Sequence, residues 1–414
     1  MVPLANSAAG SRMAPPRRGD DVMFVVGTLE VGGSERHISA IAQALQRRGR
    51  QISIYCLSGS GPLHAELESG GVTVLLPPVD RGIATKSLFI RMLRLSLAAA
   101  GLLLVLLRRR PAIVHFFLPE AYITGAPLAI LARVRPRVMS RRSLNHYQAR
   151  RPLLGRLERQ LHGRMQAVLG NSASVVRDLN DEGVPPQHIG LIYNGVDLPR
   201  LAPKIDRATM RAGLGLSPPT LTITIVANLI PYKGHHDLLQ ALGGAKRSLP
   251  ADWRLLIVGR DDGIEKELRA EAKRLDIARH VLFLGPRVDV PELLGVSDIG
   301  ILCSHEEGFS NSVLEGMAAG LPMIVTNVGG NAEAVIDGEC GLVVPARDPQ
   351  KLGEAIIMLT NDTELRTRLG SAARQRVETH FTIEKCIDAY DELYTGLLAG
   401  KAPIEIEAIR AGVK

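Results

Sequence analysis

Two glutamates of the chain are spaced so that they can share one ligand. Glu307 and Glu315 lie eight positions apart in the segment 304–318, which reads Ser-His-Glu-Glu-Gly-Phe-Ser-Asn-Ser-Val-Leu-Glu-Gly-Met-Ala. A predicted strand precedes this segment, and the pattern predicts a helix that begins near Asn311 or Ser312. Glu307 would then lie in the loop and Glu315 about one turn inside the helix, so both carboxylates can face a ligand over the helix start.

The start of this helix is suited to a phosphate group. Backbone N–H groups from Gly308 to Ser312, past Phe309, Ser310 and Asn311, can receive a diphosphate there. The alternative is an ordinary helix whose dipole stabilises acidic residues near its N-terminus. For two isolated carboxylates that alternative is the better one, so the interpretation depends on the rest of the chain.

A glycine-rich turn lies near the N-terminus. Residues 27–36, Gly-Thr-Leu-Glu-Val-Gly-Gly-Ser-Glu-Arg, follow the first predicted strand and precede a helical pattern that begins near His37. Gly32 and Gly33 let the backbone approach a ligand closely, and a helix N-terminus favours an anion. The G-x-G-x-x-G dinucleotide fingerprint is absent, so a tight turn explains the run about as well as a phosphate site does.

Apolar strand-like runs alternate with longer helical patterns in both halves of the chain, which predicts an α/β architecture with parallel sheets. The first half contains such runs at 22–26, 51–56, 72–76, 112–116, 137–140 and 167–169. After the proline-rich stretch 199–219 they recur at 221–227, 254–258, 281–284, 299–303, 322–326 and 341–344. Two such series predict two doubly wound domains with a cleft between them, where ligands bind beyond the carboxyl ends of the strands.

The expected domains span residues 21–200 and 201–380. A helix over 381–400 is expected to pack back on the first domain, and residues 1–20 and 401–414 are expected to be tails. The first tail has no apolar run, so it is not expected to be a signal peptide.

The composition is that of a folded globular protein, with 46% hydrophobic and 22% charged residues among 414. Aromatic residues make up only 4%, which disfavours single-stranded nucleic-acid binding by base stacking. The four cysteines form no C-x-x-C pair, so neither a zinc site nor a disulfide framework is predicted, and a reducing cytosol is expected.

The net charge of +8 is unevenly distributed. Residues 1–200 contain 26 Lys/Arg and 13 Asp/Glu, whereas residues 201–414 contain 24 and 29. The region 81–164 contains 17 basic residues and two acidic ones, so it is expected to face something anionic. A nucleic-acid partner is disfavoured because this region lacks interleaved aromatic residues and any helix-turn-helix pattern.

The same region contains an apolar run over 95–107, flanked by arginines. Its 13 residues are too few for a membrane span, which needs about 20. The more frequent explanation is a buried helix of the domain. The alternative is a helix that lies on a membrane surface with its arginines on lipid phosphates.

Further motifs occur in a fixed order around the two glutamates. They are Asn194-Gly-Val-Asp197, Ala227-Asn-Leu-Ile-Pro-Tyr-Lys233-Gly234, Gly285-Pro-Arg287, Gly320-Leu-Pro-Met-Ile-Val-Thr326 and Asn327-Val-Gly-Gly-Asn-Ala-Glu333. This ordered set resembles the retaining glycosyltransferases of family 4, which have the GT-B fold of two facing Rossmann-like domains. The resemblance covers residues 22–398 and is densest between 221 and 345, and Glu307-x7-Glu315 matches the family's paired-glutamate motif.

The resemblance implies roles for individual residues. Glu315 would hydrogen-bond the ribose hydroxyls of a nucleotide-sugar, Glu307 would lie beside the donor sugar, and Lys233 would bind the diphosphate as a point charge. Further donor contacts would come from Gly32, Gly33, Asn228, Gly285, Arg287 and the loop Gly308–Ser312. Family members act without a divalent metal, so neither a metal nor another cofactor is expected.

Two positions depart from the family's pattern. Asn228 stands where the family usually has an arginine five residues before the diphosphate lysine, and Arg260 or Arg287 could replace that cation. His115 is present where members often carry two histidines, but Phe117 stands in place of the second. The resemblance makes His115, with Glu307 and Lys233, a catalytic candidate that contacts the donor sugar or the acceptor. A lone histidine at a strand end is more often structural.

The sequence thus predicts a retaining, metal-independent glycosyltransferase that uses a nucleotide-sugar, expected to be a UDP-sugar. The basic region favours a lipid-linked saccharide acceptor at the cytoplasmic face of the plasma membrane, because lipid phosphates attract each nearby Lys/Arg by about 1 kcal/mol. Such an enzyme would build cell-envelope glycans such as lipopolysaccharide or exopolysaccharide.

Two alternatives stay open. One is a GT-B sugar-nucleotide epimerase or phosphorylase, and the other is a non-catalytic membrane- or partner-binding module with a degenerate donor site. An NAD enzyme is disfavoured because neither domain carries the dinucleotide fingerprint.

Overall fold

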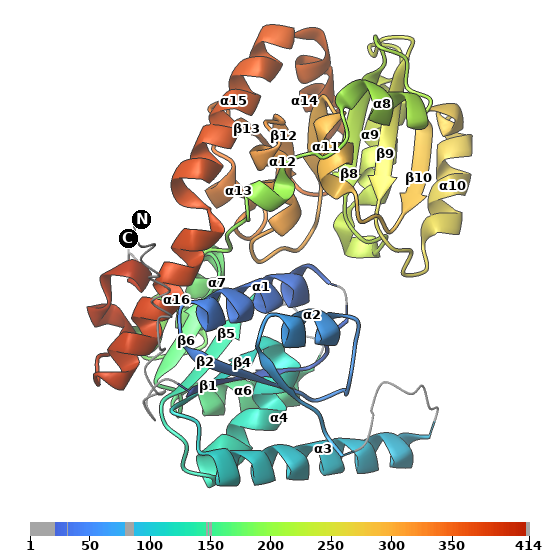
Figure 1. Ribbon diagram of the computed structural model, residues 1–414. Coiled ribbons are helices and arrows are strands. Elements are labelled where there is room, and N and C mark those ends of the chain that lie inside the picture. Colours follow the sequence, from blue (N-terminus) through green and yellow to red (C-terminus); the bar gives the residue numbers. More distant parts are fainter. Residues whose placement is uncertain (1–20, 31, 79–86, 146–147, 149–150, 411–414) are drawn as a thin grey trace, which may run out of the picture.

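The computed structural model describes residues 21–30, 32–78, 87–145, 148 and 151–410 of the chain. The predicted N-terminal tail over 1–20 and the last residues of the predicted C-terminal tail, 411–414, lie outside the described residues. The described strands form two parallel sheets, each with helices on both faces, and the two domains face each other (Figure 1). The predicted α/β class with two doubly wound domains is confirmed.

The sheet of the N-terminal domain has seven strands in the order β3-β2-β1-β4-β5-β6-β7. These strands are β1 (Asp21–Val26), β2 (Gln51–Cys56), β3 (Thr73–Leu75), β4 (Ile113–Phe117), β5 (Arg137–Arg141), β6 (Ala167–Gly170) and β7 (Ile189–Leu191). Apart from the extra β7, this is the strand order of the Rossmann fold, in which the order reverses between β1 and β4.

The sheet of the C-terminal domain has six strands in the corresponding order, β10-β9-β8-β11-β12-β13. They are β8 (Leu221–Val226), β9 (Trp253–Val258), β10 (Val281–Gly285), β11 (Ile299–Leu302), β12 (Met323–Thr326) and β13 (Gly341–Val344). The order reverses between β8 and β11, so each domain has its own switch point for ligand binding.

Helices cover both faces of each sheet, which explains why the strands are apolar runs rather than alternating ones. The N-terminal domain has α1 (Gly33–Arg47), α2 (Leu63–Ser69), α3 (Leu88–Arg109), α4 (Leu118–Leu131), α6 (Pro152–His162) and α7 (Ala173–Asp181). The C-terminal domain has α8 (Arg207–Gly213), α9 (His235–Ala245), α10 (Glu265–Arg274), α11 (Val290–Gly295), α12 (Asn311–Ala318), α13 (Asn331–Ala334), α14 (Pro349–Asn361) and α15 (Thr363–His380).

The last helix, α16 (Ile383–Leu398), returns the chain to the N-terminal domain (Figure 1). Its Leu393 and Tyr394 are fully buried in a core shared with β1, β2 and α1. The crossing is tight, since a Cβ on Gly195 would lie 2.3 Å from the carbonyl oxygen of Thr382. The two domains are thus linked by two chain segments that run side by side.

The predicted C-terminal tail is wrong for residues 401–410. Two short 3-10 helices, η5 (Pro403–Glu405) and η6 (Glu407–Ile409), follow α16. Ile406 and Ile409 are buried in the N-terminal core, where Ile409 packs beside Gly190 of β7. Burial of these two side chains stabilises the segment against the domain.

The helix α3 is longer than the 13-residue apolar run in the sequence indicates. It has 22 residues, and the window Phe89–Arg109 is long and apolar enough to cross a membrane by length and composition, with 17% of it buried. One face packs on the sheet, where Ala98 accepts a hydrogen bond from Tyr55 Oη at 2.8 Å and Leu102 is fully buried. The remaining faces are largely exposed, so α3 is only in part the buried domain helix that was the more frequent expectation.

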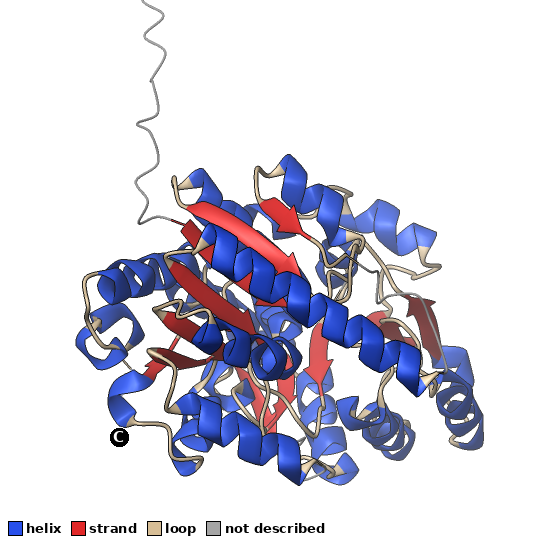
Figure 2. Ribbon diagram, turned by 90° about the horizontal axis from the view of Figure 1, so that it is seen from below, coloured by secondary structure: helices blue, strands red, loops and turns tan. Residues whose placement is uncertain are grey.

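The position of α3 sets it apart from the other helices. It runs along the side of the N-terminal domain that is remote from the C-terminal domain (Figure 1), and it crosses in front of the sheet in the view from below (Figure 2). Its exposed apolar surface therefore faces away from the space between the domains.

Candidate functional site

A cleft of about 640 Å³ lies between the two domains. Its walls are the loops that follow β1 and β4 in one domain and β8 and β11 in the other, so the two switch points face each other across it. The described residues that line it include Gly32, Gly33, Ser34, Glu35, Arg36, Leu118, Arg142, Ser143, Asn171, Asn194, Asn228, Tyr232, Lys233, Arg260, Pro286, Arg287, Glu306, Glu307, Gly308, Phe309, Ser310, Asn311, Ser312 and Glu315.

Most of the residues singled out in the sequence meet in this cleft. They are Gly32, Gly33, Asn228, Lys233, Arg287, Glu307, Gly308, Phe309, Ser310, Asn311, Ser312 and Glu315. Gly285 is the end of β10 and does not line the cleft itself, whereas the next two residues, Pro286 and Arg287, do.

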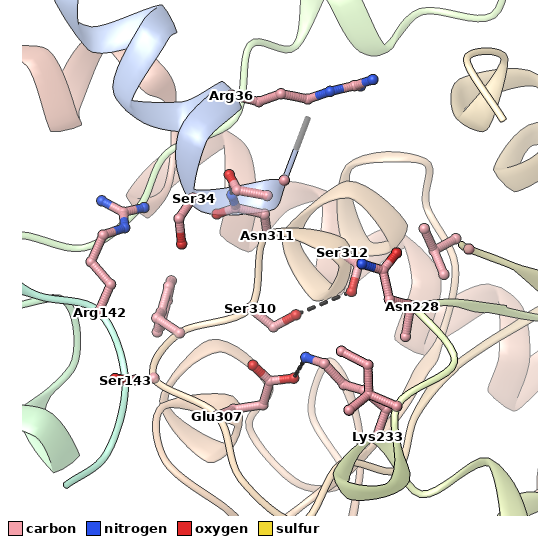
Figure 3. A pocket seen from close by; sticks show the side chains of 18 of the residues that line it. Ser34, Arg36, Arg142, Ser143, Asn228, Lys233, Glu307, Ser310, Asn311 and Ser312 are labelled. Atoms are coloured by element: carbon pink, nitrogen blue, oxygen red, sulfur yellow. Dashed lines mark hydrogen bonds and ion pairs between the residues drawn. The ribbon is translucent and has the colours of Figure 1, made fainter. Parts of the chain in front are cut away.

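Lys233 and Glu307 both line the cleft on the side of the C-terminal domain and form an ion pair (Figure 3). Lys233 ends the 3-10 helix η3 (Pro231–Lys233) after β8, and Glu307 lies in the loop after β11. The same oxygen of Glu307 accepts a hydrogen bond from Ser304 Oγ at 2.9 Å. Burial lowers the pKa of Lys233, but the neighbouring carboxylate outweighs it and raises the pKa above its usual value. The lysine is therefore a fixed cation held at the edge of the cleft.

The N-terminus of α12 opens into the cleft beside this pair. Ser310 is the N-cap, its side chain makes no capping hydrogen bond to the described amides of the first turn, and Ser310 Oγ lies 3.1 Å from Ser312 Oγ (Figure 3). No acidic residue occurs in the first turn. Uncapped amides at a positive helix end, next to a lysine, form a site for an anion such as a phosphate.

Glu315 lies one turn into α12 and is half-buried in the cleft wall. Burial raises the pKa of its carboxyl group to about 7, and the positive charge of Arg36 on α1 opposes this shift. A half-buried carboxylate is stabilised when a ligand donates hydrogen bonds to it. Neighbouring hydroxyl groups of a ribose are suitable donors.

The two arginines considered from the sequence as replacements for the cation that Asn228 leaves out both line the cleft, and each pairs with an aspartate. Arg287 forms a bidentate pair with Asp289, at 2.7 and 2.5 Å, and Arg260 pairs with Asp262 at 2.9 Å. The side chain of Asn228 accepts a hydrogen bond from the backbone N–H of Arg260 at 3.2 Å. Both arginines are thus already neutralised by an aspartate two positions away.

His115 does not lie in the cleft, and its predicted contact with the donor sugar or the acceptor is wrong. The ring is fully buried and stacks on Phe117. Its Nδ1 lies 2.7 Å from Tyr394 Oη, and its Nε2 lies 2.8 Å from Ser140 Oγ. Burial holds its pKa well below the usual value, so the ring is neutral. The helix α16 covers the position that a ligand would need.

A polar network at the domain junction was missed in the sequence. Nη2 of Arg142 lies 2.9 Å from His37 Nδ1 and donates to Asn194 Oδ1 at 2.8 Å. Asn194 Nδ2 donates to the backbone oxygen of Phe309 and to Asn311 Oδ1, both at 2.8 Å. A sequence signal for Arg142 was its place two residues after the predicted strand 137–140, at the carboxyl end where ligands bind in such sheets.

A second contact between the domains is made by Glu333. Its carboxylate accepts hydrogen bonds from the backbone N–H groups of Ala173 and Ser174, at 2.7 and 2.9 Å, and so caps the N-terminus of α7. Among the residues that the structure describes, no three His, Cys, Asp or Glu side chains gather as possible metal ligands.

Two family models match the chain. Residues 31–200 match Glycosyltransferase Family 4, and residues 206–376 match glycosyl transferases group 1. The two matches meet at the junction between the domains and together cover most of the described residues.

Curated relatives match over part of their length. N-acetyl-alpha-D-glucosaminyl L-malate synthase of Bacillus anthracis is 33% identical over 232 residues, which are 56% of this chain and 60% of the relative. UDP-Gal:alpha-D-GlcNAc-diphosphoundecaprenol alpha-1,3-galactosyltransferase of Escherichia coli is 30% identical over 221 residues, 53% of this chain and 57% of the relative. The chain thus matches less than two thirds of the length of these proteins.

Solved structures show the same fold. Anabaena HepE in complex with UDP has a TM-score of 0.79 at 23% identity and covers 91% of this chain and 100% of its own. The sucrose-phosphate synthase of Thermosynechococcus elongatus has a TM-score of 0.77 at 20% identity, over 92% of this chain and 100% of its own. The expected GT-B fold is therefore confirmed. With a GT-B fold, the paired glutamates in its cleft and family models over both domains, the chain belongs to glycosyltransferase family 4.

Proposed function

We propose that the chain transfers a sugar from a UDP-sugar to a saccharide acceptor, with retention at the anomeric carbon and without a metal. The observation that carries this proposal is the grouping of Lys233, Glu307, the uncapped start of α12 and Glu315 along one wall of the cleft. A nucleoside diphosphate-sugar matches these groups in order, with the ribose at Glu315, the diphosphate at the helix start and the sugar at Glu307.

The arrangement accounts for catalysis through charge. Glycosyl transfer develops positive charge on the sugar ring and negative charge on the departing diphosphate. Lys233 and the first-turn amides of α12 are fixed where that negative charge would grow, so they stabilise the transition state more than the ground state. Glu307, held by Lys233 and Ser304, orients the sugar rather than attacking it. The acceptor hydroxyl would attack from the leaving-group face and pass its proton to the departing phosphate oxygen.

Relatives support the choice of donor. The E. coli relative is named for UDP-Gal, and Anabaena HepE has been crystallised with UDP and with UDP-glucose. The choice of uridine among nucleotides rests on these relatives and on the family.

We further propose a lipid-linked acceptor at the cytoplasmic face of the plasma membrane, as in the assembly of cell-envelope glycans. The helix α3 supports this, because Phe89 is 76% and Met92 55% exposed while Arg91 and Arg108–Arg110 flank the apolar surface. Apolar side chains with arginines at both ends are typical of a helix at a membrane surface. The E. coli relative, by its name, acts on a diphosphoundecaprenol-linked sugar.

Calorimetric titration of the purified protein with UDP in the presence of EDTA tests the donor site. We expect micromolar binding that Glu315→Ala weakens more than tenfold, because the ribose loses its carboxylate partner. Glu339→Ala, at an exposed position outside the cleft, is the matched control. Absence of UDP binding would contradict the proposal and favour the non-catalytic module, and binding that requires a divalent metal would contradict metal independence.

A further inference from the structure

The cleft contains five cationic side chains among the described residues, and they differ in how they are neutralised. They are Arg36 and Arg142 from the N-terminal domain and Lys233, Arg260 and Arg287 from the C-terminal domain. A departing nucleoside diphosphate carries at least two negative charges, so the number of cations that can reach it matters for both binding and catalysis.

Four of these cations have partners. Lys233 pairs with Glu307, Arg260 with Asp262 and Arg287 with Asp289. Arg142 is only 8% exposed and is held at the domain junction by His37 and Asn194. If the paired arginines do not bind the diphosphate, Lys233 is the one cation of the C-terminal domain, among the described lining residues, that can bind it, and Lys233 is itself paired with a carboxylate.

Arg36 differs from the others. It stands in the first turn of α1 and is exposed, and its side chain makes no hydrogen bond or ion pair with any residue that the structure describes, although its backbone N–H donates to Gly32. A cation in the first turn is opposed by the helix dipole, so this position does not stabilise α1. Its long side chain lies above α12 in the view of Figure 3, and its charge acts on Glu315.

We propose that Arg36 is the second cation for the donor's diphosphate, supplied from the opposite domain in place of the one that Asn228 does not provide. The inference rests on the proposed donor site. An arginine matches the role, because its guanidinium forms charge-assisted, bidentate hydrogen bonds to phosphate oxygens. A cation on the N-terminal domain that binds an anion held by the C-terminal domain also draws the two domains together around the donor.

Calorimetry with two ligands separates this role from a general loss of structure. Arg36→Ala is expected to weaken UDP binding about 10- to 100-fold, the effect of losing charged hydrogen bonds, and to leave uridine binding unchanged because uridine has no phosphate. Arg47→Ala removes the same charge from the exposed last turn of the same helix and is expected to bind UDP like the wild type.

A restored cation provides the second arm of the test. Asn228→Arg in the Arg36→Ala background is expected to recover at least tenfold of the lost UDP affinity, because it returns a cation to the C-terminal side of the site. Two results would overturn this inference but leave the proposed function intact. One is a UDP affinity of Arg36→Ala within twofold of that of Arg47→Ala, and the other is an equal loss of affinity for UDP and for uridine. Wild-type protein that binds no UDP would instead overturn the proposed function and this inference with it.

Discussion

The two glutamates of the paired motif lie in different electrostatic surroundings. Glu307 is held by Lys233 and by Ser304 Oγ, whereas Glu315 is half-buried, and the positive charge of Arg36 favours its ionised form without outweighing the effect of burial. The first carboxylate is satisfied by the protein itself. The second depends on a ligand, so the folded protein carries an unfavourable charge there when the cleft is empty.

This difference predicts a gain in stability from Glu315→Gln. Burial raises the pKa of Glu315 from 4.5 to about 7, so its ionised form is less stable in the folded state than in the unfolded chain. The cost is absent below pH 4.5, grows as the pH rises towards 7 and is complete above it. Urea unfolding at pH 8 should therefore show Glu315→Gln to be about 1–3 kcal/mol more stable than the wild type.

The same measurement near pH 4 provides the control, because Glu315 is then mostly protonated in both the folded and the unfolded state, so the stabilities of the two proteins should agree. Glu339→Gln, at an exposed position, should change stability little at either pH. A wild type that is the more stable protein at pH 8 would show that Glu315 has a compensating partner in the folded state.

Residue patterns predicted one wall of the cleft better than the other. The donor-side residues lie in three local segments around Asn228, Arg287 and Glu307, where each motif follows a strand. The prediction that His115 contacts a ligand was wrong because the surroundings of its ring are set by Tyr394, which lies 279 positions later. No spacing rule near His115 contains that information.

Among the elements, α3 and α12 show what local sequence determines. The predicted start of α12 at Asn311 is confirmed, since the polar run Ser310–Ser312 marks the N-cap and an apolar pattern follows it. For α3 the apolar run marked the centre of the helix but not its beginning. Ser87 caps the helix by accepting from the backbone N–H of Ile90, and Phe89, Met92 and Leu93 extend the apolar surface towards it.

The exposed surface of α3 predicts binding to anionic membranes. A triple variant should bind phosphatidylglycerol-containing vesicles at least tenfold more weakly than the wild type, because inserted apolar side chains provide much of the affinity. Its changes are Phe89→Ser, Met92→Ser and Leu93→Ser. Vesicle flotation measures the effect. Met358→Ser on α14, 52% exposed in the C-terminal domain, is the control and should bind like the wild type. A wild type that does not float with these vesicles would contradict the membrane proposal.

At the scale of the whole molecule, the last part of the chain belongs to the first domain. The helix α16 and the segment after it complete the N-terminal core, so that domain is assembled from both ends of the sequence. The cleft then lies between two bodies joined by two neighbouring crossings, at Val196 and Thr382, which pair as an isolated β-bridge. Relative motion of the domains must occur about these crossings.

The buried C-terminal segment predicts a stability effect at its end. Ile409→Ala should lower the free energy of unfolding by about 2–4 kcal/mol, because it leaves a cavity beside Gly190 in the N-terminal core. Ile404→Ala, in the same segment but 40% exposed, should cost far less. Denaturant unfolding of the two variants compares them directly. If both variants lost the same small amount of unfolding free energy, residues 401–410 would not stabilise the domain.

The sequence by itself determined the two doubly wound domains and the donor side of the cleft. Parallel strands buried on both faces appear as continuous apolar runs, and glycines, a lysine and glutamates at their carboxyl ends mark ligand loops. The strand β7, Ile-Gly-Leu, was missed because it is short and a glycine interrupts its apolar run. The apolar runs and the ligand loops are local features, so neighbouring residues in the sequence specify them.

Tertiary structure alone decided what reaches the cleft from elsewhere. It paired Lys233 with Glu307, 74 positions away. It also placed Arg36 opposite Glu315 and covered His115 with α16. These outcomes depend on how two domains meet and on where the chain returns, and contacts between residues so far apart in sequence leave no periodic or local pattern to read.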